Sequence, residues 1–274
     1  MNDIHQDSHL SHLTAAGLDH LEGLAWLDMY RATPAAFAGS VELACKEMPE
    51  AFGLAIRNVG ASLFNRALFP RVQQEAIAWL GDHGNAAHAI DACADESDTL
   101  HATLEQSGFN RRGGGMAQFW RLAQTPVDIP DSRLTIEAVG REHGADFGNV
   151  MTAGYGLPAS FSSRFAGLPG RQDWHAYLAF DDGVPVSCAA MYVVDDAAWL
   201  GVAATLPQYR ELGAQSGLLA RRLVDGTASG VRTFAVQTGY PDAGESPGPS
   251  FRNIQRAGFA LSHVRHRYVA SSRR

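Results

Sequence analysis

The sequence predicts an α/β (α+β) protein of two similar units, each with a central, mixed and mostly antiparallel sheet flanked by helices. Short apolar runs alternate with segments of helical periodicity along the whole chain. Turn signals such as Asp181-Asp182-Gly183 separate successive apolar runs, as they do in hairpins. The segments 104–109 and 254–259 resemble each other, and each lies between a helix and a final strand. This likeness predicts an internal duplication of one α/β unit.

The composition is that of a globular protein with room for one large domain or two small ones. The chain has 274 residues, of which 46% are hydrophobic and 19% are charged. No apolar run is long enough to span a membrane, and the polar N-terminus does not resemble a secretory signal. Cys45, Cys93 and Cys188 are far apart, which predicts neither a disulfide framework nor a cysteine zinc site. We therefore expect a cytoplasmic protein with no membrane partner and no bound metal.

The charge distribution distinguishes the two halves of the chain. A net charge of −7 argues against nucleic acid as the main partner. Acidic residues predominate in residues 1–130, whereas acidic and basic residues are nearly equal in number in residues 131–274. An anionic ligand is therefore expected in the second half.

The first unit is predicted to follow a flexible tail at residues 1–14 and to occupy residues 15–123. Residues 18–30 form a helix, because their leucines recur with helical spacing and Pro34 follows the end. The Arg- and Gly-rich segment 111–115 is interpreted as a flexible turn, since it does not open a helix as a phosphate-binding loop would. The other predicted elements are strands at 53–59, 62–69, 86–92 and 116–122 and helices at 71–80 and 98–106.

Residues 124–131, which contain Pro126 and Pro130, are predicted to be a linker to a second unit at residues 132–274. Residues 154–173 are rich in Gly, Pro and Ser and are predicted to be a loop with one short helix. The remaining pattern predicts strands at 134–139, 174–180, 185–194, 197–204, 231–238 and 261–269 and helices at 142–153, at 213–228 and before Ala257.

The segment 201–223 has the pattern of an anion-binding turn. An apolar strand ends before Pro207, a polar turn follows, and a helix opens with small residues after Gly213. Unpaired backbone N–H groups at such a helix start lie at the positive end of the helix dipole, where a phosphate or pyrophosphate binds. Gly213 permits a tight turn and a close approach of the anion. Arg210 either adds positive charge there or braces the loop.

This segment resembles motif A of the GNAT N-acetyltransferase superfamily. The matching residues are Pro207, Tyr209, Arg210, Gly213 and Ala214. Residues 250–259, a helix that ends in Gly258-Phe259, resemble the family's motif B, and the two motifs stand in the family's order. The resemblance covers residues 131–270 well and residues 15–123 only as a degenerate copy, as in a tandem two-copy form.

The resemblance implies an enzyme that uses acetyl-CoA as co-substrate. An acetyl group would pass to an amine by direct attack in a ternary complex, and the acceptor would be a small-molecule amine or a peptide. The pyrophosphate would lie on the loop before the helix and the pantetheine arm along the preceding strand. The implied CoA-binding residues are Ala203, Ala204, Thr205, Arg210, Glu211, Leu212, Gly213, Ala214, Gln215, Ser216 and Asn253, of which Asn253 could instead cap its helix.

The chain departs from the family pattern at four positions, one of which is Pro247, where the family often has an asparagine that opens the motif B helix. Glu211 and Gln215 stand where the family favours glycine or alanine, and Ile254 stands where a tyrosine often serves as general acid. Either another residue donates a proton to the leaving CoA thiolate, or no acid is needed because the thiolate can leave unprotonated. The acid candidates are Tyr240, Ser250 and Tyr209, and the base candidates are Glu245 and Asp242, although the two carboxylates could equally be solvated loop residues.

Two other functions remain open from the sequence. A protein that kept the CoA site but lost catalysis would be a sensor or an interaction protein, and Ile254 favours that alternative. An unrelated nucleotide-binding α/β protein would need the turn to lie in a parallel βαβ unit, against which the hairpin-like strands argue. The first copy lacks the loop, so we expect it to bind no CoA and to shape the acceptor site. Trp199 is either a core residue or a wall of that site.

Overall fold

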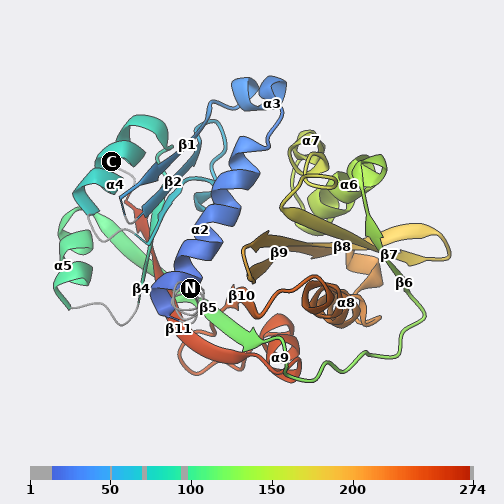
Figure 1. Cartoon of the computed structure of the whole chain (residues 1–274). Coiled ribbons are helices and arrows are strands. Elements are labelled where there is room, and N and C mark those ends of the chain that lie inside the picture. The colour runs from blue at the N-terminus through green and yellow to red at the C-terminus, as the bar shows by residue number, and fades with distance from the viewer. Residues whose placement is uncertain (1–13, 50, 70–72, 94–97, 272–274) are drawn as a thin grey trace, which may run out of the picture.

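The fold is a mixed α/β architecture, as the sequence predicts, but its strands form one large sheet and not one sheet in each unit. A computed structural model describes residues 14–49, 51–69, 73–93 and 98–271. The predicted tail lies outside these residues except for Thr14, whose hydroxyl accepts a hydrogen bond from the N–H of Gly17 and caps the first helix. Within the described ranges, eight α-helices surround an 11-stranded sheet (Figure 1).

The first half contains four α-helices and five strands. They are α2 (Ala15–Arg31), α3 (Ala35–Ser40), β1 (Leu43–Met48), β2 (Ala51–Ile56), the 3₁₀ turn η1 (Ser62–Phe64), β3 (Arg66–Leu68), α4 (Gln73–His83), β4 (Ala89–Cys93), α5 (Asp98–Gln106) and β5 (Phe109–Leu122).

The second half contains the remaining helices and strands. They are β6 (Thr135–Val139), η2 (Arg141–His143), α6 (Gly144–Gly154), η3 (Ala159–Phe161), α7 (Ser162–Ala166), β7 (Trp174–Asp181), β8 (Val184–Val194), β9 (Ala197–Thr205), η4 (Pro207–Tyr209), α8 (Ala214–Ala228), β10 (Thr233–Gly239), α9 (Pro249–Arg256) and β11 (Ala260–Ala270). The predicted linker, residues 124–131, has no helix or strand.

Three local predictions were wrong. Strand β1 was not predicted, because it is an edge strand in which Lys46 and Glu47 interrupt the apolar pattern. The predicted strand 62–69 is a 3₁₀ turn followed by the three-residue β3. The predicted turn 111–115 lies within β5, where the five residues from Arg112 to Met116 oppose three residues of β11, Arg265 to Arg267. The glycines therefore form a bulge in a paired strand.

The last strand of each half lies beside strands of the other half. The strand order is β1-β2-β3-β4-β11-β5-β10-β9-β8-β7-β6. Strand β11 thus lies between β4 and β5 of the first half, whereas β5 pairs with β10 of the second half. This exchange joins the two predicted sheets into one and leaves no free strand edge at the centre.

The two halves have corresponding strand directions. Strands β1, β2 and β3 are antiparallel neighbours and β3 is parallel to β4. Likewise, β7, β8 and β9 are antiparallel neighbours and β9 is parallel to β10. The turn into α8 therefore lies in a parallel βαβ unit, and the expectation against such a unit was wrong, because it was drawn from the hairpins that precede β9. The correspondence agrees with duplication of one unit, but the duplication and the domain boundaries stay predictions.

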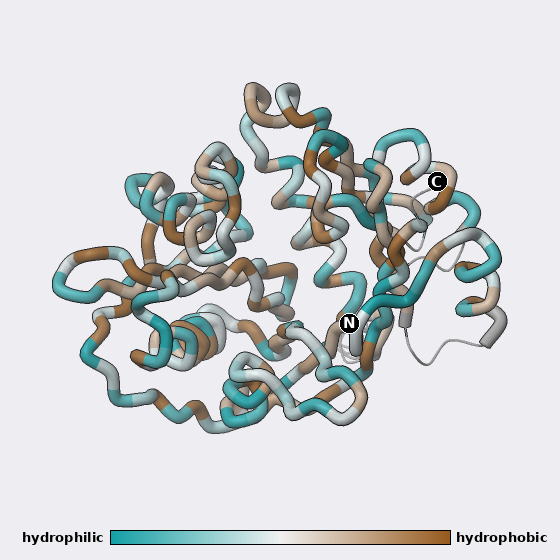
Figure 2. Tube along the Cα trace, turned by 180° about the vertical axis from the view of Figure 1, so that it is seen from behind, coloured by the Kyte–Doolittle hydropathy of each residue, from teal (hydrophilic) through white to brown (hydrophobic). Residues whose placement is uncertain are grey.

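The two halves also share a hydrophobic core. Helix α2 crosses one face of the sheet near its centre (Figure 1). The largest apolar cluster combines Leu21 and Ile56 of the first half with Phe147 and Trp199 of the second. On the opposite face, α8 and α9 cover a second cluster that includes Phe119 of β5. Figure 2 shows hydrophobic residues along the strands and hydrophilic residues on many outer loops. Among the described helices, none is both long and apolar enough to cross a membrane.

Candidate functional site

Strands β9 and β10 separate partway along their length. They pair in parallel from Ala197↔Thr233 to Leu200↔Val236, and the pairing ends there. On its other side, β9 slips in register against β8 between Gly201 and Ala204, and Val202 has a φ of +51°. This β-bulge bends the end of β9 and opens a V between the two strands. The backbone of β9 in the open part can therefore meet an extended ligand as a further strand would.

The loop between β9 and α8 contains two residues in the left-handed region of backbone conformation. Glu211 has a φ of +69° and Gly213 has a φ of +81°. Gly213 is the N-cap of α8, and no side chain caps the helix. The backbone N–H groups of its first turn are consequently available to a ligand, at the positive end of the helix dipole.

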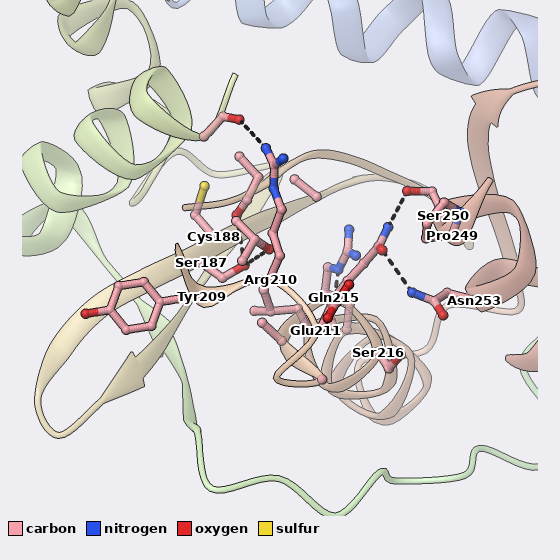
Figure 3. A pocket seen from close by; sticks show the side chains of 18 of the residues that line it. Ser187, Cys188, Tyr209, Arg210, Glu211, Gln215, Ser216, Pro249, Ser250 and Asn253 are labelled. Carbon is pink, nitrogen blue, oxygen red and sulfur yellow. Dashed lines mark hydrogen bonds between the residues drawn. The ribbon is translucent and has the colours of Figure 1, made fainter. Parts of the chain in front are cut away.

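A cavity of about 820 Å³ lies around this helix start (Figure 3). It collects ten of the eleven residues that the sequence assigned to CoA. They are Ala203, Ala204, Thr205, Arg210, Glu211, Gly213, Ala214, Gln215, Ser216 and Asn253. The eleventh, Leu212, contacts the apolar cluster of Leu134 and Leu218 instead. The structure thus brings the predicted residues together, while their role in binding stays a prediction.

Only some of the candidate catalytic residues lie at the cavity. Ser250 and Tyr209 line the cavity, whereas Tyr240, Asp242 and Glu245 do not. The latter three lie in the segment between β10 and α9, and Tyr240 is 38% exposed. The structure does not bring these three to the cavity wall.

The lining of the cavity is positively charged. It includes Arg210, Arg222 and Arg256 but only one carboxylate, that of Glu211. Arg222 is buried and donates hydrogen bonds to the carbonyl oxygens of Leu218 and Ala190. Burial lowers the pKa of Arg222 to about 10, so it stays charged at neutral pH. An anion in the cavity would therefore be stabilised.

Arg210 braces the loop as well as contributing charge. Its guanidinium donates a hydrogen bond of 3.3 Å to the carbonyl oxygen of Gly154, at the end of α6. Gly154 itself lies against β9, because a Cβ there would be 2.8 Å from the Cβ of Ala204. The end of α6 therefore forms part of the cavity wall together with β9.

Gln215 connects the start of α8 to α9. Its amide nitrogen donates to the hydroxyl oxygen of Ser250 at 3.0 Å, and its amide oxygen accepts from the amide nitrogen of Asn253 at 2.9 Å (Figure 3). Its side chain is thus directed toward α9. Asn253, for which CoA contact and helix capping were both open, contacts Gln215 in this structure.

The sequence did not predict several of the residues that line the cavity. Gly154 and Tyr155 of the α6 end and Ser187 of β8 reach the cavity only through tertiary packing. Arg222 and Arg256 lie on the two motif helices, and their positive charge could have indicated them.

Cys188 and Trp199, which both lie in apolar runs, are buried. Cys188 is fully buried, and burial raises the pKa of its thiol to about 12, so it is not a thiolate at neutral pH. Trp199 is 1% exposed and belongs to the core.

Comparison of the sequence with protein-family models and with curated proteins finds no match. Solved structures do match. A GCN5-related N-acetyltransferase from Kribbella flavida has a TM-score of 0.58 at 16% identity, over 88% of this chain and 95% of its own. A second from Sphaerobacter thermophilus has a TM-score of 0.61 at 16% identity, over 82% and 78% of the two chains. A GNAT-family protein from Novosphingobium aromaticivorans has a TM-score of 0.55 at 16% identity, over 89% and 99%.

These alignments extend over both halves of the chain and not the second half alone. Their TM-scores of 0.55 to 0.61 over most of this chain indicate a shared fold. The chain has the fold of the GNAT superfamily.

Proposed function

We propose that this protein is an acetyl-CoA-dependent N-acetyltransferase that acts by direct attack of an amine in a ternary complex. The observation that carries the proposal is the V between β9 and β10, which leads to the uncapped start of α8. An extended thioester with an anionic end fits such an arrangement.

The residues around the cavity suit the anionic end of acetyl-CoA. The N–H groups at Gly213, Ala214 and Gln215 would hold the pyrophosphate, and three lining arginines supply compensating charge. The side chain of Gln215 is directed toward α9, so it does not cap these N–H groups. Glu211 is the one lining residue whose negative charge would disfavour the pyrophosphate, and mutation can test its effect.

The chain's own groups would act mainly by positioning. The backbone of β9 would orient the thioester, and its N–H groups would stabilise the oxyanion that forms on the acetyl carbonyl. Ile254 is buried in the apolar cluster beneath α9 and cannot give a proton. The CoA thiolate would therefore leave without a tyrosine acid. Tyr240 and Glu245 do not line the cavity and would act through water.

The first half would serve the site of the second half. In the described residues, α4 begins five positions after β3 ends, so no loop like that of residues 206–213 separates them. The first half instead supplies β5, which pairs with β10 along the V. The acceptor is proposed to be a small-molecule amine or a peptide, and the location the cytoplasm.

Calorimetric titration with acetyl-CoA, followed by thiol release with a panel of amines, tests the proposal. One binding site per chain and turnover with at least one amine are expected. A second site would overturn the assignment of a single CoA-binding half, and absence of binding would overturn the function.

One observation favours a second function. Because Ile254 replaces the usual acid, a CoA-binding sensor or interaction protein without catalysis is the alternative. Stoichiometric binding without turnover of any amine would favour it.

A further inference from the structure

A cluster of buried charged and polar side chains lies beneath α2, at the centre of the sheet. Arg265 of β11 is 2% exposed, and its guanidinium lies 3.2 Å from a carboxylate oxygen of Asp19 and 2.7 Å from one of Glu22. Glu22 is fully buried, and its other carboxylate oxygen accepts from the indole N–H of Trp26 at 3.2 Å. Two carboxylates of α2 therefore fix the position of one arginine.

The same guanidinium holds two glutamines of adjacent strands. One of its nitrogens donates to the amide oxygen of Gln237 on β10 at 2.7 Å and to that of Gln118 on β5 at 3.3 Å. Gln118 and Gln237 are directly opposite each other in the β5–β10 ladder. They differ in surroundings, since Gln118 is completely buried whereas Gln237 is partly exposed.

Gln237 stands where the V opens. The last paired residues of β9 and β10 are Leu200 and Val236, so Gln237 is the first residue of β10 beyond the pairing. The bulge at Val202 begins at the corresponding level of β9. A thioester that runs along β9 from Thr205 to Gly201 would span four residue steps, about 13 Å at the rise of a strand, and would end beside Gln237.

The contact with Arg265 determines which way the amide of Gln237 faces. A guanidinium only donates hydrogen bonds, so the amide oxygen must face Arg265 and the amide nitrogen must face away. No printed hydrogen bond joins that nitrogen to another described residue, and Gln237 is partly exposed, just beyond the residues that line the cavity. A fixed N–H donor is thus available at the vertex of the V.

We propose that the amide nitrogen of Gln237 donates a hydrogen bond to the carbonyl oxygen of the acetyl thioester, an inference that rests on the proposed function. The amine nitrogen forms a bond to the carbonyl carbon, and the π electron pair moves to the oxygen. The pair then returns, the C–S bond breaks, and the sulfur leaves as thiolate while the amine's extra proton passes to water. Gln237 transfers no proton. Its donor stabilises the negative oxygen, and Arg265, Asp19 and Glu22 are positioning residues.

Two variants and one matched control test this role. Gln237→Met removes the donor with little change of length, and Gln237→Glu keeps an acceptor for Arg265 but lacks the donor. Gln118→Met also loses a hydrogen bond to Arg265, of 3.3 Å, together with one to the carbonyl oxygen of Leu18, at a buried position one strand from the V. The first readout is isotope-edited infrared spectroscopy of acetyl-CoA labelled with ¹³C at the carbonyl, which needs no acceptor.

We expect the carbonyl stretch of bound acetyl-CoA to be lower in the wild type and in Gln118→Met than in both Gln237 variants. With an amine substrate, kcat should fall about 10²-fold in the Gln237 variants, as for loss of one oxyanion donor, with acetyl-CoA affinity within about twofold of the wild type. Equal spectra and equal kcat in Gln237→Met and Gln118→Met would overturn this role alone. A wild-type protein that binds no acetyl-CoA would overturn the proposed function and this role together.

Discussion

Arg267 of β11 donates two hydrogen bonds, of 2.7 and 2.8 Å, to the carboxylate of Asp91 on β4. Asp91 is also 2.5 Å from the guanidinium of Arg66 on β3. The contact therefore ties the last described strand of the second half to two strands of the first. The two halves are connected by buried charge as well as by backbone pairing.

Cutting the chain within residues 124–131 should test this connection. Residues 132–274 alone should not fold, because β10 would lose β5 and β11 would lose both of its neighbours. Circular dichroism and thermal melting of the fragment are the measurements. Co-expression of residues 1–131 with residues 132–274 is the control and should restore a folded pair. A cooperative melt of the isolated second half would contradict the prediction.

Asp91→Asn should destabilise the protein by about 3–5 kcal/mol at pH 7, because it leaves Arg66 buried without a carboxylate partner. Burial alone would raise the pKa of Asp91, but Arg267 and Arg66 outweigh it and hold the pKa well below its usual range. The stabilisation is therefore complete above about pH 4, the unfolded value, and is lost as the pH falls through the folded-state pKa. Urea unfolding from pH 7 to pH 3 measures the beginning of this loss of stability. Glu75→Gln, which removes an exposed pair with Lys46, should cost less than about 1 kcal/mol.

Gly213→Ala should weaken acetyl-CoA binding strongly. Gly213 has a φ of +81°, so alanine strains the loop that would hold the pyrophosphate. Gly230→Ala is the matched control, since Gly230 has a φ of +101° and, like Gly213, no close neighbour for a Cβ. Both variants should lose about 1 kcal/mol of stability, but calorimetry should show weaker binding only for Gly213→Ala. Equal affinities would argue against the site.

Glu211→Gly should stabilise the protein and tighten acetyl-CoA binding. Glu211 has a φ of +69°, and glycine removes the left-handed strain of about 1 kcal/mol together with a negative charge at the cavity. Asp182→Gly relieves a φ of +49° in the β7–β8 turn, which does not line the cavity. Thermal melting should rise in both variants, whereas calorimetry should show tighter binding only for Glu211→Gly. Unchanged binding would mean that Glu211 is neutral toward the anion.

Gln215→Ala should cost about 1–2 kcal/mol, because two hydrogen bonds between α8 and α9 are lost. The family favours a small residue here, so acetyl-CoA affinity should not fall. A double-mutant cycle with Ser250→Ala, followed by urea unfolding, separates the coupling between the two side chains. Independent effects of the two substitutions would show that the bridge does not form in solution.

Local patterns predicted most elements well. Helix α5 has the predicted bounds, and β7, β8 and β9 agree within one residue at each end, because their apolar runs are bounded by turn signals. The motif between β9 and α8 likewise predicted one wall of the cavity, since its residues are neighbours in sequence.

What the sequence did not predict depends on contacts between distant residues. The pairing of β11 with β4 could not be predicted from the periodicity of either strand, because that periodicity is the same whichever strand is the partner. For the same reason, the contacts of Gln237 with Arg265 and of Arg210 with Gly154 could not be predicted. The glycines at 113–115 were read as a turn, because a bulge in a paired strand has the same local composition.

The position of β11 between β4 and β5 also affects when the chain can complete its folding during synthesis. Val269 pairs with Ala89, so the strands that flank β11 are synthesised long before it. Until β11 emerges from the ribosome, the facing edges of β4 and β5 have no partner between them and can pair with other chains. Contacts this distant in sequence are slow to form. Folding should therefore finish only after β11 is released, and chaperones that cover exposed strand edges should contact nascent chains that lack it.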